Sequence, residues 1–412
     1  MDIEQFPKAG YAAIDRICDY YTTLESRPVS STVKPGYLAP CCPPRRQKRA
    51  RIGGIIEADY DRLIMPGLTH WQHPSFFAYF PTATSFESII GELYANAAPH
   101  PGFNRLLALP AYAKSPPSPD VLVIYVTQTH SLGLKAGRML GLQVRALEVT
   151  AEDMFALRGS VLHKALTEDK AAGRYPFVLI ATVGSTSSVA DHPEVWLHVD
   201  AAWAGLAPAL PAINAAADSF TTNFHKWGFV TFDASTLWVR DRKALARALD
   251  ITPPFLRTAH GNAGTVIDYR NWHLALGRRF RSLKLWFVLR GFGVEVLRKH
   301  VSQGITLNAA FAALPAQSDT LTLVTPPSLA LTVFRLVPPD VDFKLDLEKL
   351  NTLNVAFFAR LARRPDITIT QTVLKGVFCV RFAVGAARTT EKHVRAAFDA
   401  IVEEAHATAQ PM

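Results

Sequence analysis

A lysine and an aspartate, each in apolar surroundings, are the residues of this sequence best suited to chemistry. Lys226 stands between His225 and Trp227, and a lysine among aromatic residues is costly to bury as a cation, so its pKa tends to fall. A neutral lysine amine can form an imine with an aldehyde, although a lone lysine is more often a surface residue. Asp200 ends an apolar segment, where its carboxylate either caps a helix or holds the proton of a heterocyclic nitrogen.

Two further polar positions follow apolar segments. Thr186 lies in the hydroxyl-rich stretch 182–188, whose hydroxyls and amides suit either a phenolic or phosphate oxygen or an ordinary polar turn. His130 follows an apolar segment that ends at Val126, and its imidazole could stack on a flat ring or simply lie in a loop. Taken one at a time, these signals leave both interpretations open.

The elements that must position these residues alternate between apolar segments of strand length and segments with helical periodicity. The expected strands are 121–126, 143–149, 177–183, 195–200 and 236–240, and the expected helices between them are 132–140 and 160–172. Such alternation predicts an α/β fold with a mainly parallel sheet that is covered on both faces. Ligands of such sheets bind beyond the carboxyl ends of the strands, which is where Asp200 lies.

The two ends of the chain have different patterns. Residues 2–28 and 55–64 have the apolar spacing of helices. After residue 284 a long apolar helix, 285–300, is followed by expected strands at 321–324, 330–337 and 377–384 and a closing helix at 391–405. We therefore expect three parts: a helical N-terminal arm for dimerisation (1–85), a large domain (86–283) and a small α+β domain (284–412).

Composition excludes several classes of protein. The 412 residues are 49% hydrophobic and 19% charged, which is typical of folded chains. No apolar run approaches the roughly 20 residues of a membrane span, and the acidic N-terminus is unlike a secretory signal. The four cysteines lack metal-ligand spacing, so we expect reduced thiols, a cytoplasmic location and no metal. The net charge of +9 includes a basic run at 45–51 that we interpret as a solvated loop, and it suits anionic small molecules.

The order of the polar residues resembles that of a known family, the group II pyridoxal-dependent decarboxylases, which include the aromatic L-amino acid, tyrosine and histidine decarboxylases. The residues in this order are His130, Thr186, Asp200, Ala202, Asn223, His225 and Lys226, and the segments that carry the resemblance are 35–38, 64–71, 77–82, 196–205, 217–227 and 276–288. The resemblance implies a fold-type I PLP-dependent transferase-like fold and a homodimer that binds pyridoxal 5'-phosphate. It also implies decarboxylation of an aromatic L-amino acid of the tyrosine or tryptophan class to its amine and CO2.

The resemblance also implies a role for each matched residue. Lys226 would bond covalently to the cofactor, Asp200 would pair with the pyridinium nitrogen, and His130 and Ala202 would lie on opposite faces of the ring. The other implied cofactor contacts are Thr186, Asn223, His225 and Gly277, the last in a segment that approaches from the partner subunit. The implied substrate pocket is Tyr79, Phe80, Pro81, Thr82 and Phe103. The basic run at 278–281 would then be part of an interface or structural, and no nucleic acid or membrane partner is expected.

The chain departs from the family pattern in a segment that should bind phosphate. Relatives of this type have a Gly-rich stretch and a Ser-Ala-Ser-type turn before the stacking histidine, at a helix N-terminus that holds the phosphate. Here residues 101–104 lead almost directly into the proline-rich stretch 110–119. A block of about 60 residues, which would contain a helix and a strand of a βαβ unit, is missing. The stretches 188–196 and 203–218 are also short.

A second departure concerns the catalytic loop. Phe255, in the segment 252–257, stands where the family usually has a tyrosine that returns a proton to the α-carbon. In related aromatic aldehyde synthases this change accompanies oxidative deamination, which yields an aldehyde, ammonia and hydrogen peroxide. The sequence therefore leaves three possibilities: a decarboxylase, an aromatic aldehyde synthase, and an inactive homologue that lacks the phosphate-binding loop.

Overall fold

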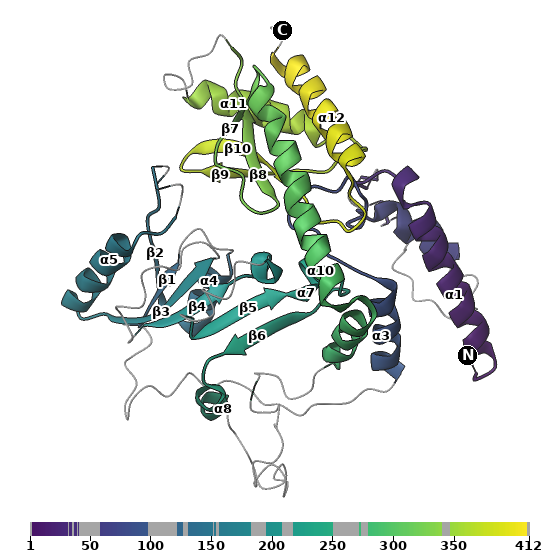
Figure 1. Cartoon of the computed structure of the whole chain (residues 1–412), viewed down its shortest axis with the longest axis horizontal. Helices are drawn as coiled ribbons and strands as arrows, with labels where there is room; N and C mark the ends of the chain where they lie inside the picture. Colours follow the sequence, from purple (N-terminus) through teal and green to yellow (C-terminus); the bar gives the residue numbers. More distant parts are fainter. Residues whose placement is uncertain are drawn as a thin grey trace, which may run out of the picture. The chain divides into compact units, whose positions relative to one another are not determined.

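A six-stranded sheet forms the centre of residues Ala83–Ser302 in the described part of the chain (Figure 1). Its order is β2-β1-β3-β4-β5-β6, with β1 (Leu122–Val126), β2 (Gln143–Ala146), β3 (Tyr175–Thr182), β4 (Trp196–Asp200), β5 (Ser219–Asn223) and β6 (Ser235–Val239). Strands β1 to β5 pair in parallel, and β6 pairs antiparallel to β5. The predicted mainly parallel α/β fold is confirmed.

The structure, a computed structural model, describes most but not all of the chain. The described residues are 2–31, 33–34, 37–38, 40, 58–97, 122–126, 131–150, 152–153, 156–182, 195–207, 217–249, 272, 279–339 and 347–409. They divide into two compact units, one of Ala83–Ser302 and one that combines Met1–Thr82 with Gln303–Met412. The expected three-part division at residues 85 and 283 stays a prediction.

The parallel strands bring several chain segments to one edge of the sheet. Thr182 lies beside Asp200 in the β3–β4 register, and Asp200 lies beside Thr221 in the β4–β5 register. Below this edge the sheet is held by a core of fully buried side chains, which include Tyr125, Leu179, Leu197 and Val199. Burial of such side chains contributes about 1.5–3 kcal/mol each, so the polar strand ends rest on a rigid apolar base.

Helices cover this sheet and flank it. They are α3 (Phe86–Ala97), α4 (Leu132–Leu140), α5 (Gly159–Ala171), α7 (Phe224–Trp227), α8 (Arg242–Leu249) and the beginning of α10 (Arg281–Ala313), together with the 3-10 turn η5 (Ala204–Leu206). Helices α3 and α10 approach closely at Gly91, where an added Cβ would lie only 2.6 Å from the Cα of Lys284. Glycine at that position therefore allows the two helix backbones to pack directly.

The other unit contains a four-stranded antiparallel sheet of order β7-β8-β10-β9. Its elements are α1 (Gln5–Thr22), η1 (Leu24–Ser26), η2 (Tyr60–Ile64), η3 (Met65–Gly67), η8 (Pro315–Gln317), β7 (Leu321–Leu323), β8 (Leu331–Leu336), α11 (Leu347–Leu361), β9 (Thr370–Leu374), β10 (Val377–Ala383) and α12 (Glu391–Ala409). The ring of Phe382 stacks on those of Phe77 and Phe311, so N-terminal and C-terminal segments share one core. Over the described residues we find no helix with the length and apolarity to cross a bilayer.

Candidate active site

The side chains of Lys226 and Asp200 come from neighbouring parallel strands. Strand β4 ends at Asp200, and β5 ends at Asn223, directly before the short helix α7 that carries Lys226. Burial lowers the pKa of the Lys226 amine, and the negative charge of Asp200 partly opposes that shift. The structure thus brings together a half-buried amine and a carboxylate at the carboxyl edge of the sheet.

Backbone contacts hold Asp200 in place. One carboxylate oxygen, Oδ1, accepts a hydrogen bond from the amide of Ala202 at 3.0 Å. The carbonyl of Ala202 in turn accepts from the amide of Asn223 at 3.2 Å, and the Asn223 side-chain oxygen accepts from the Ser235 hydroxyl at 2.7 Å. Three of the predicted cofactor contacts, Asp200, Ala202 and Asn223, are therefore tied into one hydrogen-bonded group.

A histidine that sequence reasoning did not single out lies beside this group. His198 is two residues before Asp200 in β4, so both side chains project from the same face of the strand. Its Nδ1 lies 2.8 Å from the hydroxyl of Ser219, and its Nε2 lies 3.3 Å from that of Thr221. Burial lowers the pKa of His198, against the opposing effect of Asp200, and so favours the neutral ring. The sequence did contain a signal for His198: it lies two residues before Asp200 in the expected strand 195–200, so the two side chains had to share a face of that strand.

The residue before the lysine is buried against the next turn of chain. The backbone amide of His225 donates to the carbonyl of Ala234 at 3.3 Å, and the Nδ1 of its ring lies 3.0 Å from both the nitrogen and the oxygen of Ala234. Burial lowers the pKa of His225, and the charges of Lys226 and Lys284 lower it further. These effects favour the neutral form of a ring that is fixed next to the amine.

Aromatic packing holds the other side of α7. Trp227 is fully buried, and its ring stacks on that of Trp203 with 4.2 Å between centroids. At Gly205, in the turn η5, an added Cβ would lie 2.0 Å from the hydroxyl oxygen of Thr222, so only glycine permits this close approach. Both contacts join the chain after β4 to the chain after β5, and they limit movement of Lys226.

The remaining predicted site residues fall into two groups. Five of them lie outside the described residues: His130, Thr186, Phe255, Gly277 and Phe103. The predicted substrate residues Tyr79, Phe80, Pro81 and Thr82 belong to the unit that includes the C-terminal segment. There, the Tyr79 ring stacks on that of Trp71, the Arg381 guanidinium lies 5.1 Å from the Phe80 ring centroid, and the Thr82 carbonyl accepts a hydrogen bond from the Gln72 side chain.

His300 packs against the loop that follows α7, and its burial makes the stability of the protein depend on pH. Its ring lies 4.4 Å from that of Phe229, a residue of the loop that follows Lys226, and its Nε2 is buried with no hydrogen-bond partner among the described residues. Burial lowers the pKa of His300 to about 4. Below pH 6.5 the His300 ring therefore binds a proton in the unfolded chain but not in the folded chain. The free energy of unfolding falls as the pH drops toward 4.

For His300 we expect the free energy of unfolding to be about 2 kcal/mol lower at pH 5 than at pH 7, because one pKa unit corresponds to about 1.4 kcal/mol. Denaturant titrations at both pH values measure this difference. The variant His300→Phe keeps a ring against Phe229 but cannot titrate, so it should lose about that much of the pH dependence. Equal pH dependence in the variant and the wild type would contradict this account.

The described residues fit two ends of a pyridoxal cofactor. The desolvated amine of Lys226 suits an aldehyde, and the anchored carboxylate of Asp200 suits a protonated pyridine nitrogen. Burial lowers the pKa of His198 beside Asp200, which disfavours a competing positive charge there. The phosphate end is different, since the segment expected to hold it is shortened in the sequence and the stretch 98–121 is outside the described residues.

Comparisons with known proteins show which family this chain resembles over nearly its whole length. The family model described as the pyridoxal-dependent decarboxylase conserved domain matches residues 35–115 and 109–337. Phenylacetaldehyde synthase of Arabidopsis thaliana is 35% identical, with 98% of this chain and 96% of the relative covered. Tryptophan decarboxylase 2 of Oryza sativa subsp. japonica is 34% identical, with 98% and 95% covered. The crystal structure of Oryza sativa TDC with PLP and tryptamine is 28% identical with a TM-score of 0.91, with 100% and 99% covered.

The same comparisons confirm the internal deletion. The alignment with the Arabidopsis thaliana relative extends over 477 positions, although this chain has only 412 residues. Since nearly all of both chains is covered, the relative has residues with no counterpart here. Apart from that loss, sequence, fold and site lead to one conclusion: this chain belongs to the pyridoxal-dependent decarboxylase family.

Proposed function

We propose that this protein is a carboxy-lyase that uses pyridoxal 5'-phosphate to convert an aromatic L-amino acid, of the tyrosine or tryptophan class, to its amine and CO2. The observation that carries the proposal is the meeting of the Lys226 amine and the Asp200 carboxylate at the carboxyl edge of a parallel sheet. Relatives that align over nearly the whole chain support the aromatic substrate, since they include a tryptophan decarboxylase and an aromatic-L-amino-acid decarboxylase of Mus musculus.

The chain's own residues have distinct tasks in this reaction. When bound, pyridoxal 5'-phosphate supplies an electron-withdrawing ring that stabilises the negative charge left on the α-carbon as CO2 departs. Burial increases the neutral fraction of the Lys226 amine, which is the form that bonds to an aldehyde. Asp200, oriented by the Ala202 amide, would hold a proton on the ring nitrogen. The lowered pKa of His198 favours a ring without positive charge beside this carboxylate.

The reaction itself is tested by product analysis. Purified protein with added pyridoxal 5'-phosphate is incubated with tyrosine, with tryptophan and, as a control, with glutamate. We expect amine and CO2 in equal amounts from at least one aromatic substrate and neither from glutamate. A protein that binds the cofactor but releases no CO2 from any aromatic amino acid would show that the proposal is wrong.

A second candidate function is that of an aromatic aldehyde synthase. Phe255 stands where a tyrosine is usual, and a relative at 35% identity is a phenylacetaldehyde synthase. This reaction consumes one O2 and one water per amino acid and forms aldehyde, CO2, ammonia and hydrogen peroxide. Oxygen uptake and peroxide in step with CO2 release would favour it. Amine formation without oxygen uptake would exclude it.

The third possibility, an inactive homologue, is motivated by the missing phosphate segment. Charge-assisted hydrogen bonds contribute about 1.5–3 kcal/mol each, so loss of a phosphate site weakens cofactor binding substantially. Titration with pyridoxal 5'-phosphate, followed by the visible absorbance of the lysine-linked cofactor, measures that affinity. Binding at micromolar concentrations together with turnover would rule out the inactive homologue.

A homodimer is part of the proposal and is supported by exposed apolar side chains at the N-terminus. None of the residues of α1 is buried, even though several are large and apolar. Phe6 and Tyr11 are 63% and 69% exposed, and Ile3, just before the helix, is 83% exposed. Exposed apolar surface of this kind marks interaction sites. We expect light scattering to give twice the chain mass of 45.3 kDa. Phe6→Glu should weaken the dimer, Lys8→Glu on the same helix should not, and a stable monomer would contradict the prediction.

We also propose that the protein acts in the cytoplasm. Cys18 and Cys379 are free thiols, as a reducing compartment would keep them. Microscopy of the tagged full chain tests this location.

A further inference from the structure

The loop that follows Lys226 returns to the residue that precedes it. Residues 228–234 connect α7 to β6, and at the end of this loop Ala234 contacts both the backbone amide and the ring of His225 at 3.3 and 3.0 Å. The carbonyl of His225 also accepts a hydrogen bond from the amide of Ala83 at 2.7 Å. Any shift of residue 234 therefore moves the backbone next to Lys226.

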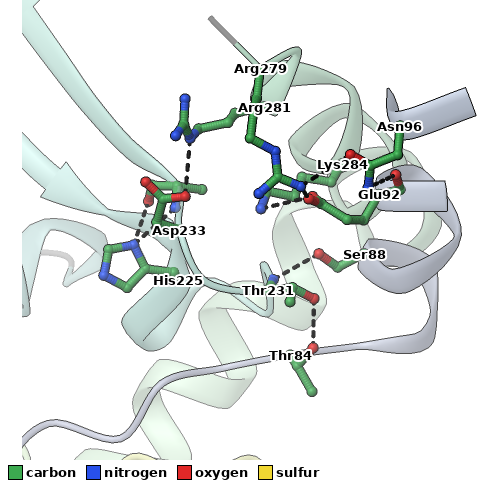
Figure 2. Close-up of polar contacts among 11 residues, drawn as sticks. Thr84, Ser88, Glu92, Asn96, His225, Thr231, Asp233, Arg279, Arg281 and Lys284 are labelled. Carbon is green, nitrogen blue, oxygen red and sulfur yellow. Dashed lines mark hydrogen bonds and ion pairs between the residues drawn. The ribbon is translucent and has the colours of Figure 1, made fainter. Parts of the chain in front are cut away.

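An ion pair holds the residue before Ala234. Asp233 accepts a hydrogen bond through Oδ1 from the Nε of Arg281 at 3.1 Å, and Arg281 is the first residue of α10 (Figure 2). The two side chains are 42% and 33% exposed, so the direct contribution of this pair to overall stability is small. Its position, one residue from the His225 contact, suggests a role other than stability.

The start of α10 is itself fixed to α3. The carboxylate of Glu92 in α3 forms ion pairs with Lys284, at 3.0 Å, and with Arg279, and Lys284 is fully buried (Figure 2). Arg279 also donates to the side chain of Asn96 at 3.3 Å. The basic run that begins at 278 thus has a structural role within the subunit for the two arginines that the structure describes, Arg279 and Arg281.

The loop also contacts α3 directly. The amide of Thr231 donates to the buried hydroxyl of Ser88 at 2.7 Å, and the hydroxyls of Thr231 and Thr84 are 2.6 Å apart. The loop, α3 and α10 therefore form a closed set of contacts, in which each element is joined to the other two. Asp233 and Arg281 form an ion pair between the loop and α10, and the charge of Lys284, also in α10, attracts Asp233 as well.

We propose that Asp233 and Arg281 are positioning residues for Lys226, because their ion pair anchors the loop that holds His225 and so keeps the lysine turn buried and correctly placed. The inference rests on the proposed function in one respect, that Lys226 carries the cofactor. Loss of the pair should let the turn loosen and let water reach the amine. A displacement of about 1 Å at a reacting group can lower a rate about a hundredfold.

The first test uses cofactor-free protein and an amine-acylating reagent. Labelling of Lys226 is followed against pH by peptide mass mapping. We expect Asp233→Asn to move the labelling midpoint upward by about half a pH unit or more, because a solvated lysine returns toward its ordinary pKa. The matched control is Asp366→Asn, which removes another aspartate–arginine pair, with Arg364, in the other unit. That variant should leave the midpoint unchanged.

The second readout is the split between kinetic constants in the loaded enzyme. Asp233→Asn should lower kcat about ten- to a hundredfold and change KM less than about threefold, since it removes none of the proposed substrate contacts. Arg281→Gln should give the same two changes, and Arg281→Lys, which keeps the cation, should recover most of the loss. These comparisons separate positioning from a general loss of stability, which Asp366→Asn would share.

Two outcomes decide the matter. If Asp233→Asn and Arg281→Gln both keep the wild-type labelling midpoint and kcat, the pair has no positioning role. If Asp233→Asn does not fold, Arg281→Gln alone decides by the same criteria, and if neither folds, the pair is structural and the inference is overturned. The labelling result does not depend on cofactor binding. A wild-type protein that never binds pyridoxal 5'-phosphate would therefore contradict the proposed function but would leave the labelling test of the Asp233–Arg281 pair valid.

Discussion

Replacing Lys226 by alanine is expected to abolish turnover, with a loss of at least about a thousandfold in kcat/KM, because it removes the half-buried amine that interacts with Asp200 at this edge of the sheet. The same variant should fail to form the visible absorbance band that the wild type forms with pyridoxal 5'-phosphate. Borohydride reduction and peptide mapping of the wild type should place the cofactor on Lys226.

The stability of Lys226→Ala provides an internal check. Burial lowers the pKa of this amine, so the folded protein gains nothing from charging it, and the variant should unfold at or above the wild-type denaturant concentration in the absence of cofactor. Lys243→Ala, at an exposed position of α8, is the matched control and should keep both absorbance band and activity. A Lys226→Ala protein that retains the band would refute the assignment of the cofactor lysine.

Asp200→Asn is expected to give the second largest effect, a fall in kcat of roughly a hundred- to a thousandfold. The physical reason is electrostatic: an amide cannot hold a proton on a ring nitrogen, and preorganised charges of this kind contribute about that much to a rate. Because the Asn side-chain oxygen can still accept from the Ala202 amide, the fold should survive. Thermal unfolding and steady-state kinetics on the same preparation separate the two effects.

The neighbouring strand offers a matched control for Asp200. Asp218 lies just before β5, at the opposite edge of the sheet, where it accepts a hydrogen bond from the Leu197 amide and pairs with Arg240. Asp218→Asn removes the same charge without touching the proposed site, so it should keep wild-type kcat. If both aspartate variants lost activity equally, a general effect of the lost charge would explain the result. The proposed role of Asp200 as the partner of the ring nitrogen would then be wrong.

Local pattern predicted most of the central sheet. The apolar segments at 122–126 and 175–182 became β1 and β3 nearly as expected, because strands that are buried on both faces need a continuous run of apolar side chains. The long helix expected at 285–300 is present but extends from Arg281 to Ala313. Its ends carry mixed residues, and such positions become helical through contacts with other segments rather than through their own periodicity.

Strand β5 shows where pattern reasoning stopped. Its sequence, Ser-Phe-Thr-Thr-Asn, has a single apolar residue, so no strand was expected there. The structure pairs its polar side chains with those of β4: Ser219 contacts the rings of Trp196 and His198, and Thr221 contacts His198. These partners are more than twenty positions away, and no local rule can supply them.

By itself, the sequence determined which groups are available for chemistry, namely a lysine with aromatic neighbours and an aspartate at a strand end, and which family they belong to. Only the tertiary structure decided that burial lowers the pKa of His198 beside Asp200 and that Asp233, in the loop that follows Lys226, pairs with Arg281. Periodicity and strand ends follow from residues close in sequence. Strand register and ion pairs between helices depend on distant segments that meet only when the chain has folded.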